Sequence, residues 1–238
     1  MSEAKFTGDK KVPLKSPLAA PEKAFVQWLT PRFPRFLEGY HLTLMTILWS
    51  AGAVWCGWLA RENIHWLWMG AGLQVAQWFT DSLDGSLGRH RDTGIPKWGY
   101  YMDHFLDYVF MACGILGLAL LLNGTDRFLM MVLMPIVVGL MVSSYLAFSA
   151  SGEFKITFLG VGPTELRLLM IVVYASAVIF GKEILALPLP YLIGLLSVVL
   201  CIVIYRTQKY IWSIDMNDKA RRLEAEAGKK AESEPAHE

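Results

Sequence analysis

The chain has 238 residues, 54% of them hydrophobic, and a formal net charge of +1 at pH 7. Long apolar runs recur along it, which is typical of a helical protein that crosses a membrane several times rather than of a water-soluble domain. The small net charge argues against a nucleic-acid partner. Cys56, Cys113 and Cys201 lie inside apolar runs, so they predict neither a disulfide framework nor a zinc site.

The first forty residues predict an N-terminal segment at the membrane surface. Residues 1–20 are polar and lysine-containing, which is typical of disorder. Residues 21–40 mix aromatic and basic side chains with two prolines and are too charged to span a bilayer. We expect one interfacial helix there, or two short ones, with Phe25, Trp28, Phe33 and Phe36 facing the bilayer. A plain juxtamembrane linker is the alternative.

Six apolar stretches follow and predict an all-α, six-helix transmembrane domain over residues 41–206. A charged tail, 207–238, comes after them, and its early part has a helical composition. The predicted spans are 41–60, 64–80, 100–122, 128–148, 165–180 and 187–205.

The distribution of basic residues predicts the orientation. With six spans, both termini lie on one side of the membrane. Of the 22 Lys and Arg residues, Arg61, Arg127 and Lys182 fall on the opposite side. Because Lys and Arg concentrate in cytoplasmic segments, we expect both termini and the 85–99 region to face the cytoplasm.

Four acids mark the ends of the second and third predicted spans. Asp81 and Asp84 are spaced i, i+3, and Asp103 and Asp107 are spaced i, i+4. On helices, each spacing places both carboxylates on one face. Four carboxylates facing lipid would be costly, and four facing one another would repel. Hard divalent cations with oxygen ligands resolve both problems, so the sequence predicts a metal site that could hold two ions.

Between the acidic pairs lies a stretch that we interpret as a flexible basic loop. Gly85, Gly88 and Gly99 would let a ligand approach the backbone, and Arg89 would place positive charge beside the acids. Cations, glycines and clustered carboxylates together suggest a metal-bound phosphate ester. Phosphoryl transfer needs charge neutralisation, positioning and a base, and these residues can supply them.

These residues also resemble a family signature. The pattern Asp81-x-x-Asp84-Gly85-x-x-Gly88-Arg89 followed by Gly99-x-x-x-Asp103-x-x-x-Asp107 is similar to that of the CDP-alcohol phosphotransferases, also called CDP-alcohol phosphatidyltransferases. The chain departs from it in two places. Gly88 stands where the family usually has alanine, and the gap from Arg89 to Gly99 is about one residue longer than is common.

The resemblance implies a role for each residue. Family members are six-helix membrane proteins, generally homodimers, that expel CMP from a CDP-linked alcohol and form a phosphodiester. Asp107 would also act as the general base that deprotonates the acceptor hydroxyl. Two ions, Mg²⁺ or Mn²⁺, would be bound by Asp81, Asp84, Asp103 and Asp107. The CDP-binding site would be lined by Gly85, Gly88, Arg89 and Gly99.

Two further features favour the choline/ethanolamine phosphotransferase branch. They are Asp103-His104, with Asp107 in the next turn, and Gly162-Pro163-Thr164-Glu165 before the fifth span. In that branch the donor is CDP-choline or CDP-ethanolamine and the acceptor is diacylglycerol. The alternative is a CDP-diacylglycerol-dependent phosphatidyltransferase. Glu165 and Arg167 are candidate acceptor-side residues, although a plain helix start explains them as well.

Other interpretations remain open at this point. The acids could line an ion pathway, which would make the chain a cation-coupled transporter; their concentration at one membrane face beside Arg89 favours an enzyme. We interpret His90, Arg91, Asp92 and Lys97 as a solvated loop whose cations attract anionic lipid. The tryptophans, among them Trp55, Trp58, Trp66 and Trp68, predict an interfacial belt.

Overall fold

The computed structural model describes residues 18–151 and 163–233. Within these ranges the chain is helical and contains no strand, which confirms the all-α class. Four short helices join or precede the long ones: α1 (Ala19–Leu29), η1 (Thr30–Arg32), η2 (Ile64–Trp66) and α7 (Glu183–Ala186). The long helices are α2 (Gly39–Leu59), α3 (Leu67–Arg91), α4 (Pro96–Leu121), α5 (Gly124–Ser151), α6 (Pro163–Phe180) and α8 (Leu189–Ser233).

Four stretches among the described residues are long and apolar enough to cross a membrane. The prediction of an integral membrane protein is therefore supported, but the predicted count of six spans is not confirmed. The helices α3 and α6 are not among the four. Both carry charged side chains at the site, and α3 also ends in three basic residues. The four stretches are Gly39–Leu59, Pro96–Leu121, Gly124–Ser151 and Glu183–Glu226.

A stripe of small residues on α2 holds the bundle together. These residues recur at intervals of three and four, which is one helix face, and all are buried. A Cβ added at Gly57 would overlap the backbone of Gly117 on α4, and one added at Gly39 would overlap the backbone of Asp84 on α3. Such close approach is typical of membrane helix pairs. The stripe is formed by Gly39, Thr43, Thr46, Ser50, Ala53 and Gly57.

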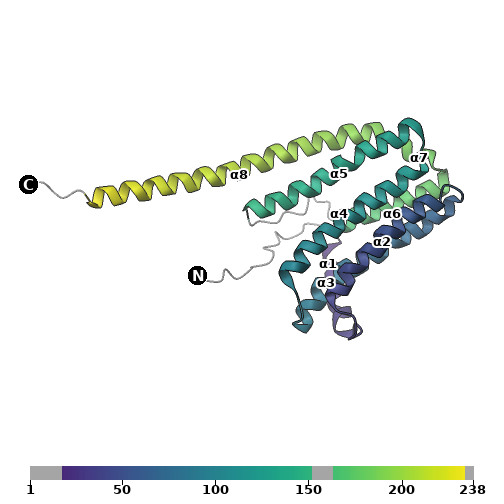
Figure 1. Ribbon diagram of the computed structural model, residues 1–238, viewed down its shortest axis with the longest axis horizontal. Helices are drawn as coiled ribbons and strands as arrows, with labels where there is room; N and C mark the ends of the chain where they lie inside the picture. The colour runs from purple at the N-terminus through teal and green to yellow at the C-terminus, as the bar shows by residue number, and fades with distance from the viewer. Residues whose placement is uncertain (1–17, 152–162, 234–238) are drawn as a thin grey trace, which may run out of the picture.

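The helices α5, α6 and α8 border a cavity beside α3 and α4. In Figure 1, α5 and α8 lie side by side, away from α2 and α3. The helix α6 packs on α3, and α4 contacts α5. The cavity lies among α3, α4, α5, α6 and α8 and has a volume of about 1710 Å³. This arrangement places a large apolar space beside the acids of α3 and α4.

The region interpreted as a flexible basic loop is mostly helical, so that interpretation was wrong. The helix α3 continues through Arg91 and ends at Asp92, whose φ of 57° is left-handed. A Cβ at Gly88 would lie 3.1 Å from the Cα of Gly94, so the turn after α3 packs closely on Gly88. An alanine there would require a small shift, which gives a physical reason for glycine at this position.

Arg91 is also not the solvated cation that we expected. Its guanidinium donates to the backbone carbonyls of Phe33, Pro34 and Leu37, at distances of 2.6–2.9 Å. It also lies 3.5 Å from the Glu38 carboxylate. These contacts are possible because the turn after η1 folds back against the end of α3. Arg91 therefore fastens the N-terminal segment to the bundle.

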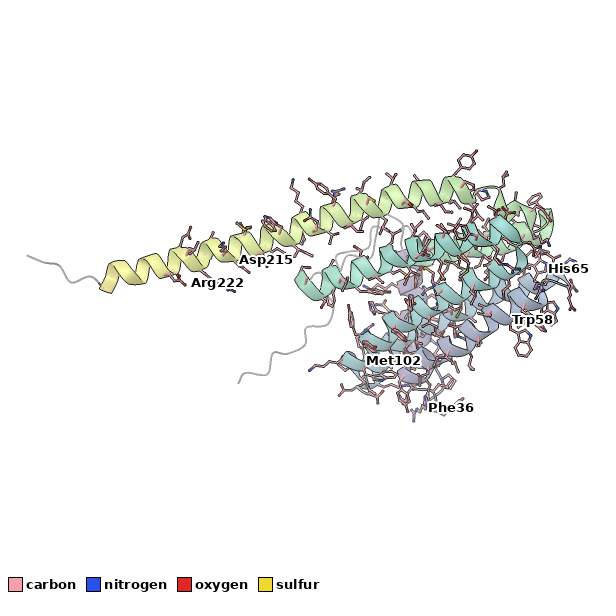
Figure 2. All side chains as sticks on the ribbon, turned by 45° about the horizontal axis from the view of Figure 1, so that its top comes forward. Phe36, Trp58, His65, Met102, Asp215 and Arg222 are labelled. Carbon is pink, nitrogen blue, oxygen red and sulfur yellow. The ribbon has the colours of Figure 1, made fainter. Side chains whose placement is uncertain are left out.

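The N-terminal segment contains the expected short helices, α1 and η1. Whether they lie at a membrane surface stays a prediction, and residues 1–17 lie outside the described residues. Figure 2 shows Phe36 and Met102 near one end of the bundle and Trp58 and His65 at the other. Trp58 is 54% exposed, as a residue of an interfacial belt would be.

The last helix runs further than the predicted sixth span. The helix α8 is continuous over 45 residues, from Leu189 to Ser233, and includes much of the charged tail. Figure 1 shows its C-terminal half projecting beyond the other helices.

Candidate metal and phosphate site

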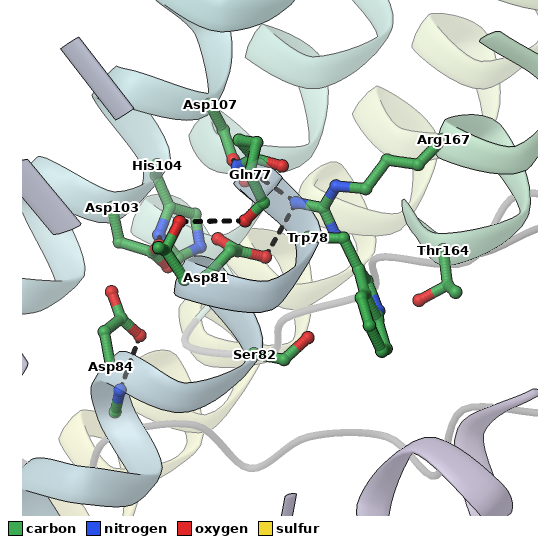
Figure 3. Close-up of polar contacts among 12 residues, drawn as sticks. Gln77, Trp78, Asp81, Ser82, Asp84, Asp103, His104, Asp107, Thr164 and Arg167 are labelled. Atoms are coloured by element: carbon green, nitrogen blue, oxygen red, sulfur yellow. Dashed lines mark hydrogen bonds and ion pairs between the residues drawn. The ribbon is translucent and has the colours of Figure 1, made fainter. Parts of the chain in front are cut away.

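Three of the four predicted metal ligands converge. Asp81 on α3 and Asp103 and Asp107 on α4 each offer a carboxylate oxygen, and these atoms lie within 4.8 Å of one another. The i, i+4 spacing puts both α4 acids on one helix face, as expected, and this face is turned toward Asp81. Figure 3 shows the three side chains pointing toward one another. At an effective dielectric constant of about 20, charges this far apart repel by about 3 kcal/mol per pair.

Asp84 occupies a separate position next to this cluster. It lies three residues beyond Asp81 on α3, where its Oδ2 accepts a 2.6 Å hydrogen bond from Thr43 Oγ1. Thr43 belongs to the small-residue stripe of α2, so the close contact of α2 with α3 orients this carboxylate. Asp84 lines the same cavity as the other three acids.

Arg167 supplies positive charge inside the cluster. Its Nη2 lies 2.7 Å from Asp81 Oδ2 and 3.5 Å from Asp107 Oδ1. The side chain is 13% exposed, so solvent screens these ion pairs weakly. We named Arg167 as an acceptor-side candidate, and the structure brings it into direct contact with the acids. Glu165 lines the cavity two residues closer to the start of α6.

Gln77 was missed by the sequence analysis. It lies one turn before Asp81 on α3 and is 1% exposed. Its Nε2 donates a 2.8 Å hydrogen bond to Asp107 Oδ1. Its Oε1 is buried and has no hydrogen-bond partner among the described residues. The amide therefore orients Asp107 and leaves one acceptor unused.

The predicted nucleotide residues all line the cavity, at the end of α3 and the start of α4. Arg89 is exposed, and its Nη2 donates to Ser86 Oγ at 3.3 Å. A Cβ at Gly85 would come within 3.2 Å of the Arg89 guanidinium, and a Cβ at Gly99 would meet nothing within 4 Å. Gly85 and Arg89 thus lie together on α3, whereas Gly99 borders open space on α4.

Aromatic rings flank the α4 acids on the side of α5. His104 packs against Tyr100 and Tyr145, with ring centroids 4.2 and 4.9 Å apart. Its Nδ1 lies 2.8 Å from the Tyr100 carbonyl oxygen. The three rings line the cavity beside Asp103.

Glu22 is a second residue that the sequence analysis missed. One carboxylate oxygen accepts from Trp78 Nε1 at 3.2 Å and from Ser82 Oγ at 2.8 Å. The other accepts from Thr164 Oγ1 at 2.7 Å. Glu22 thereby joins α1 to both α3 and α6 at the border of the cavity, where it is itself a lining residue.

The cavity changes character along its length. Past Asp107, its α4 wall continues through Phe110, Met111 and Leu118, and its α5 wall includes Leu133 and Val137. Asp107 and Gln77 therefore lie where the acidic part meets the apolar part. The cavity therefore joins an end lined by acids to an end lined by apolar side chains.

The donor atoms fit a hard divalent cation. The three clustered ligand groups are carboxylates, the type that Mg²⁺ and Mn²⁺ prefer, and their spacing allows one ion to contact all of them. In the structure, Arg167 is a positive side chain paired with Asp81 and Asp107.

Comparison with known proteins gives one family. The model of a family described as CDP-alcohol phosphatidyltransferase matches residues 40–203. Neither the curated proteins nor the solved structures contain a match.

Proposed function

The chain belongs to the CDP-alcohol phosphatidyltransferase family, whose members are transferases of substituted phosphate groups. From this premise we propose that it transfers the phospho-amino-alcohol group of a CDP-linked amino alcohol to diacylglycerol and releases CMP. The observation that carries the proposal is the continuity of the acidic cluster with a large apolar cavity. A soluble nucleotide and a membrane lipid could meet at that border.

Asp81, Asp103 and Asp107 would hold a divalent cation, and Asp84 would serve as a ligand of a second one. Bound Mg²⁺ or Mn²⁺ would neutralise the charge of the donor phosphates. The CDP group would lie along Gly85, Gly88, Arg89 and Gly99, with the exposed guanidinium of Arg89 beside a phosphate.

Asp107 would act as the general base. It lies at the apolar border, and Gln77 and Arg167 fix its carboxylate. In the proposed reaction, the acceptor hydroxyl gives its proton to Asp107 and its oxygen attacks the phosphorus that bears the amino alcohol. The bond from that phosphorus to the CMP oxygen breaks, and CMP leaves with the electron pair.

Two features support the choice of substrates. The apolar cavity is large enough for acyl chains, and it reaches the acids from the side of Asp107, where an acceptor would enter. The rings of Tyr100, His104 and Tyr145 line the cavity beside Asp103, and aromatic side chains there would favour a cationic headgroup. With CDP-diacylglycerol as donor, the same cavity would instead hold the donor chains, so this alternative must be tested directly.

A donor panel tests the substrates. Purified protein in lipid nanodiscs with Mg²⁺ would receive CDP-choline or CDP-ethanolamine with diacylglycerol, or CDP-diacylglycerol with small alcohols. We expect CMP and the matching phospholipid in the first arm, identified by mass spectrometry. Product in the second arm alone would refute the amino-alcohol assignment, and no CMP in either arm would refute the proposed transfer.

Asp107→Asn tests the base. The variant keeps the side-chain size and one ligand oxygen but cannot take a proton, and general-base help is worth about 10²–10⁴ in rate. We expect CMP release to fall at least about a hundredfold, with donor affinity retained in calorimetry. Near-normal release would leave Asp107 as a metal ligand at most.

We also propose a cytoplasmic site and termini and a homodimer. The orientation rests on the distribution of Lys and Arg, and the dimer rests on the family resemblance. Cysteine accessibility in intact cells tests the orientation. Measurement of the protein mass in detergent micelles, with the detergent contribution subtracted, tests the dimer.

A further inference from the structure

Gln77 has a hydrogen-bonding group that the proposed reaction does not yet use. The side chain is buried, lines the cavity and is fixed at one end by donating to Asp107 Oδ1 at 2.8 Å. Its carbonyl oxygen, Oε1, has no partner among the described residues. A buried polar atom without a partner costs free energy, so its presence beside a cavity points to a ligand.

The position of Oε1 limits what that ligand can be. The amide nitrogen is held by Asp107, so the oxygen on the same amide carbon lies within a few ångströms of the proposed base. An amide oxygen accepts hydrogen bonds and does not donate them, so its partner must carry a proton. A phosphate or an acyl ester offers acceptors alone and does not fit.

We propose that Gln77 binds the acceptor alcohol, with Oε1 accepting a hydrogen bond from its hydroxyl at the border between the acids and the apolar cavity. This inference rests on the proposed transfer to a lipid alcohol. Before reaction the hydroxyl donates to Gln77, and during reaction its proton passes to the adjacent Asp107. Gln77 is thus a specificity residue that favours a lipid with a free hydroxyl.

Steady-state kinetics of Gln77→Met test the role. Methionine matches glutamine in length and is apolar, so it removes the acceptor without opening a large space. We expect the KM for diacylglycerol to rise about tenfold, the usual cost of losing one such hydrogen bond, with the KM for the CDP-alcohol unchanged. The loss of the bond to Asp107 would appear separately, in kcat.

A matched variant separates this role from a structural one. Gln77→Glu keeps an oxygen in the position of Oε1, so the KM for diacylglycerol should stay within about threefold of wild type, whatever its kcat. An equal rise in both variants, or no rise in Gln77→Met, would overturn the inference.

A measurement on the wild-type protein does not depend on any variant folding. A diacyl lipid that has a hydrogen in place of the free hydroxyl should inhibit competitively with a Ki at least about tenfold above the KM of diacylglycerol. A Ki equal to the KM of diacylglycerol would show that no group of the protein recognises the hydroxyl, and it would overturn the inference. Failure of the proposed function would appear differently, as absence of CMP release from wild-type protein with any donor.

Discussion

Replacing Arg167 by methionine should make the protein dependent on a divalent cation for its stability. The guanidinium lies 2.7 Å from Asp81 and 3.5 Å from Asp107. At an effective dielectric constant of about 20, these pairs are worth about 6 and 5 kcal/mol before desolvation. Desolvation offsets much of this, and removing one partner of a buried pair costs about 3–5 kcal/mol.

The free energy of unfolding should therefore fall by about 3 kcal/mol in chelator, because three carboxylates are left without a cation. For a chain of this size, that corresponds to a fall in Tm of about 6 °C or more. Excess Mg²⁺ should restore most of the loss, since it supplies the missing charge to the same oxygens.

The assay is thermal unfolding in detergent micelles, in chelator and in excess Mg²⁺. Arg89→Met is the matched control, because it removes an exposed guanidinium near the site, and its Tm should stay within about 2 °C of wild type. An equal deficit for Arg167→Met with and without Mg²⁺ would refute the reasoning. It would show that Arg167 acts through packing rather than by compensating the metal ligands.

Two more predictions concern the scaffold. Glu22→Ala removes three hydrogen bonds that hold α1 against α3 and α6. Trypsin should therefore cleave the variant after Lys23 at least about tenfold faster than wild type. An unchanged cleavage rate would contradict this role of Glu22. Gly57→Val should not yield monodisperse protein in gel filtration, because the valine side chain would overlap the backbone of Gly117. Gly72→Val is the control: a Cβ at Gly72 meets no atom within 4 Å, so this variant should elute as wild type. Normal elution of the Gly57 variant would refute the proposed packing.

The convergence of the acids could be predicted because it depends on local spacing. Asp103 and Asp107 share a face on any helix, and the apolar flanks required a helix there. The partner acid on α3 followed from the need to bring buried carboxylates to a common cation. The same reasoning gave the all-α class and the approximate ends of most helices.

The extent of α3 could not be predicted from composition. Glycines at 85 and 88 and a run of charges are typical of a loop in isolation. In the structure, Thr43 binds Asp84 and Arg91 binds the carbonyls of the turn after η1, so tertiary contacts continue the helix. Glycine at 88 serves the close packing of the following turn rather than flexibility.

Gln77 and Glu22 were missed for a related reason. Each has its partners far along the chain, 30 residues away for Gln77 and 56 to 142 residues away for Glu22. One glutamine in an apolar run and one glutamate in an amphipathic segment carry no local signal of such partners. The small-residue stripe of α2 was visible as a repeat and could have indicated the face that meets α3 and α4.

The hydrogen bonds of Glu22 also impose an order on biosynthesis. Its partners Trp78 and Ser82 are made 56 and 60 residues later, and Thr164 is made 142 residues later. At about 5–20 residues per second, the bond to Thr164 cannot form until roughly 7–28 seconds after Glu22 is synthesised. The helix α1, the first of the described helices to leave the ribosome, is therefore fully docked only after α6 has begun to form. It reaches its final position once the start of α6 has been inserted beside α3.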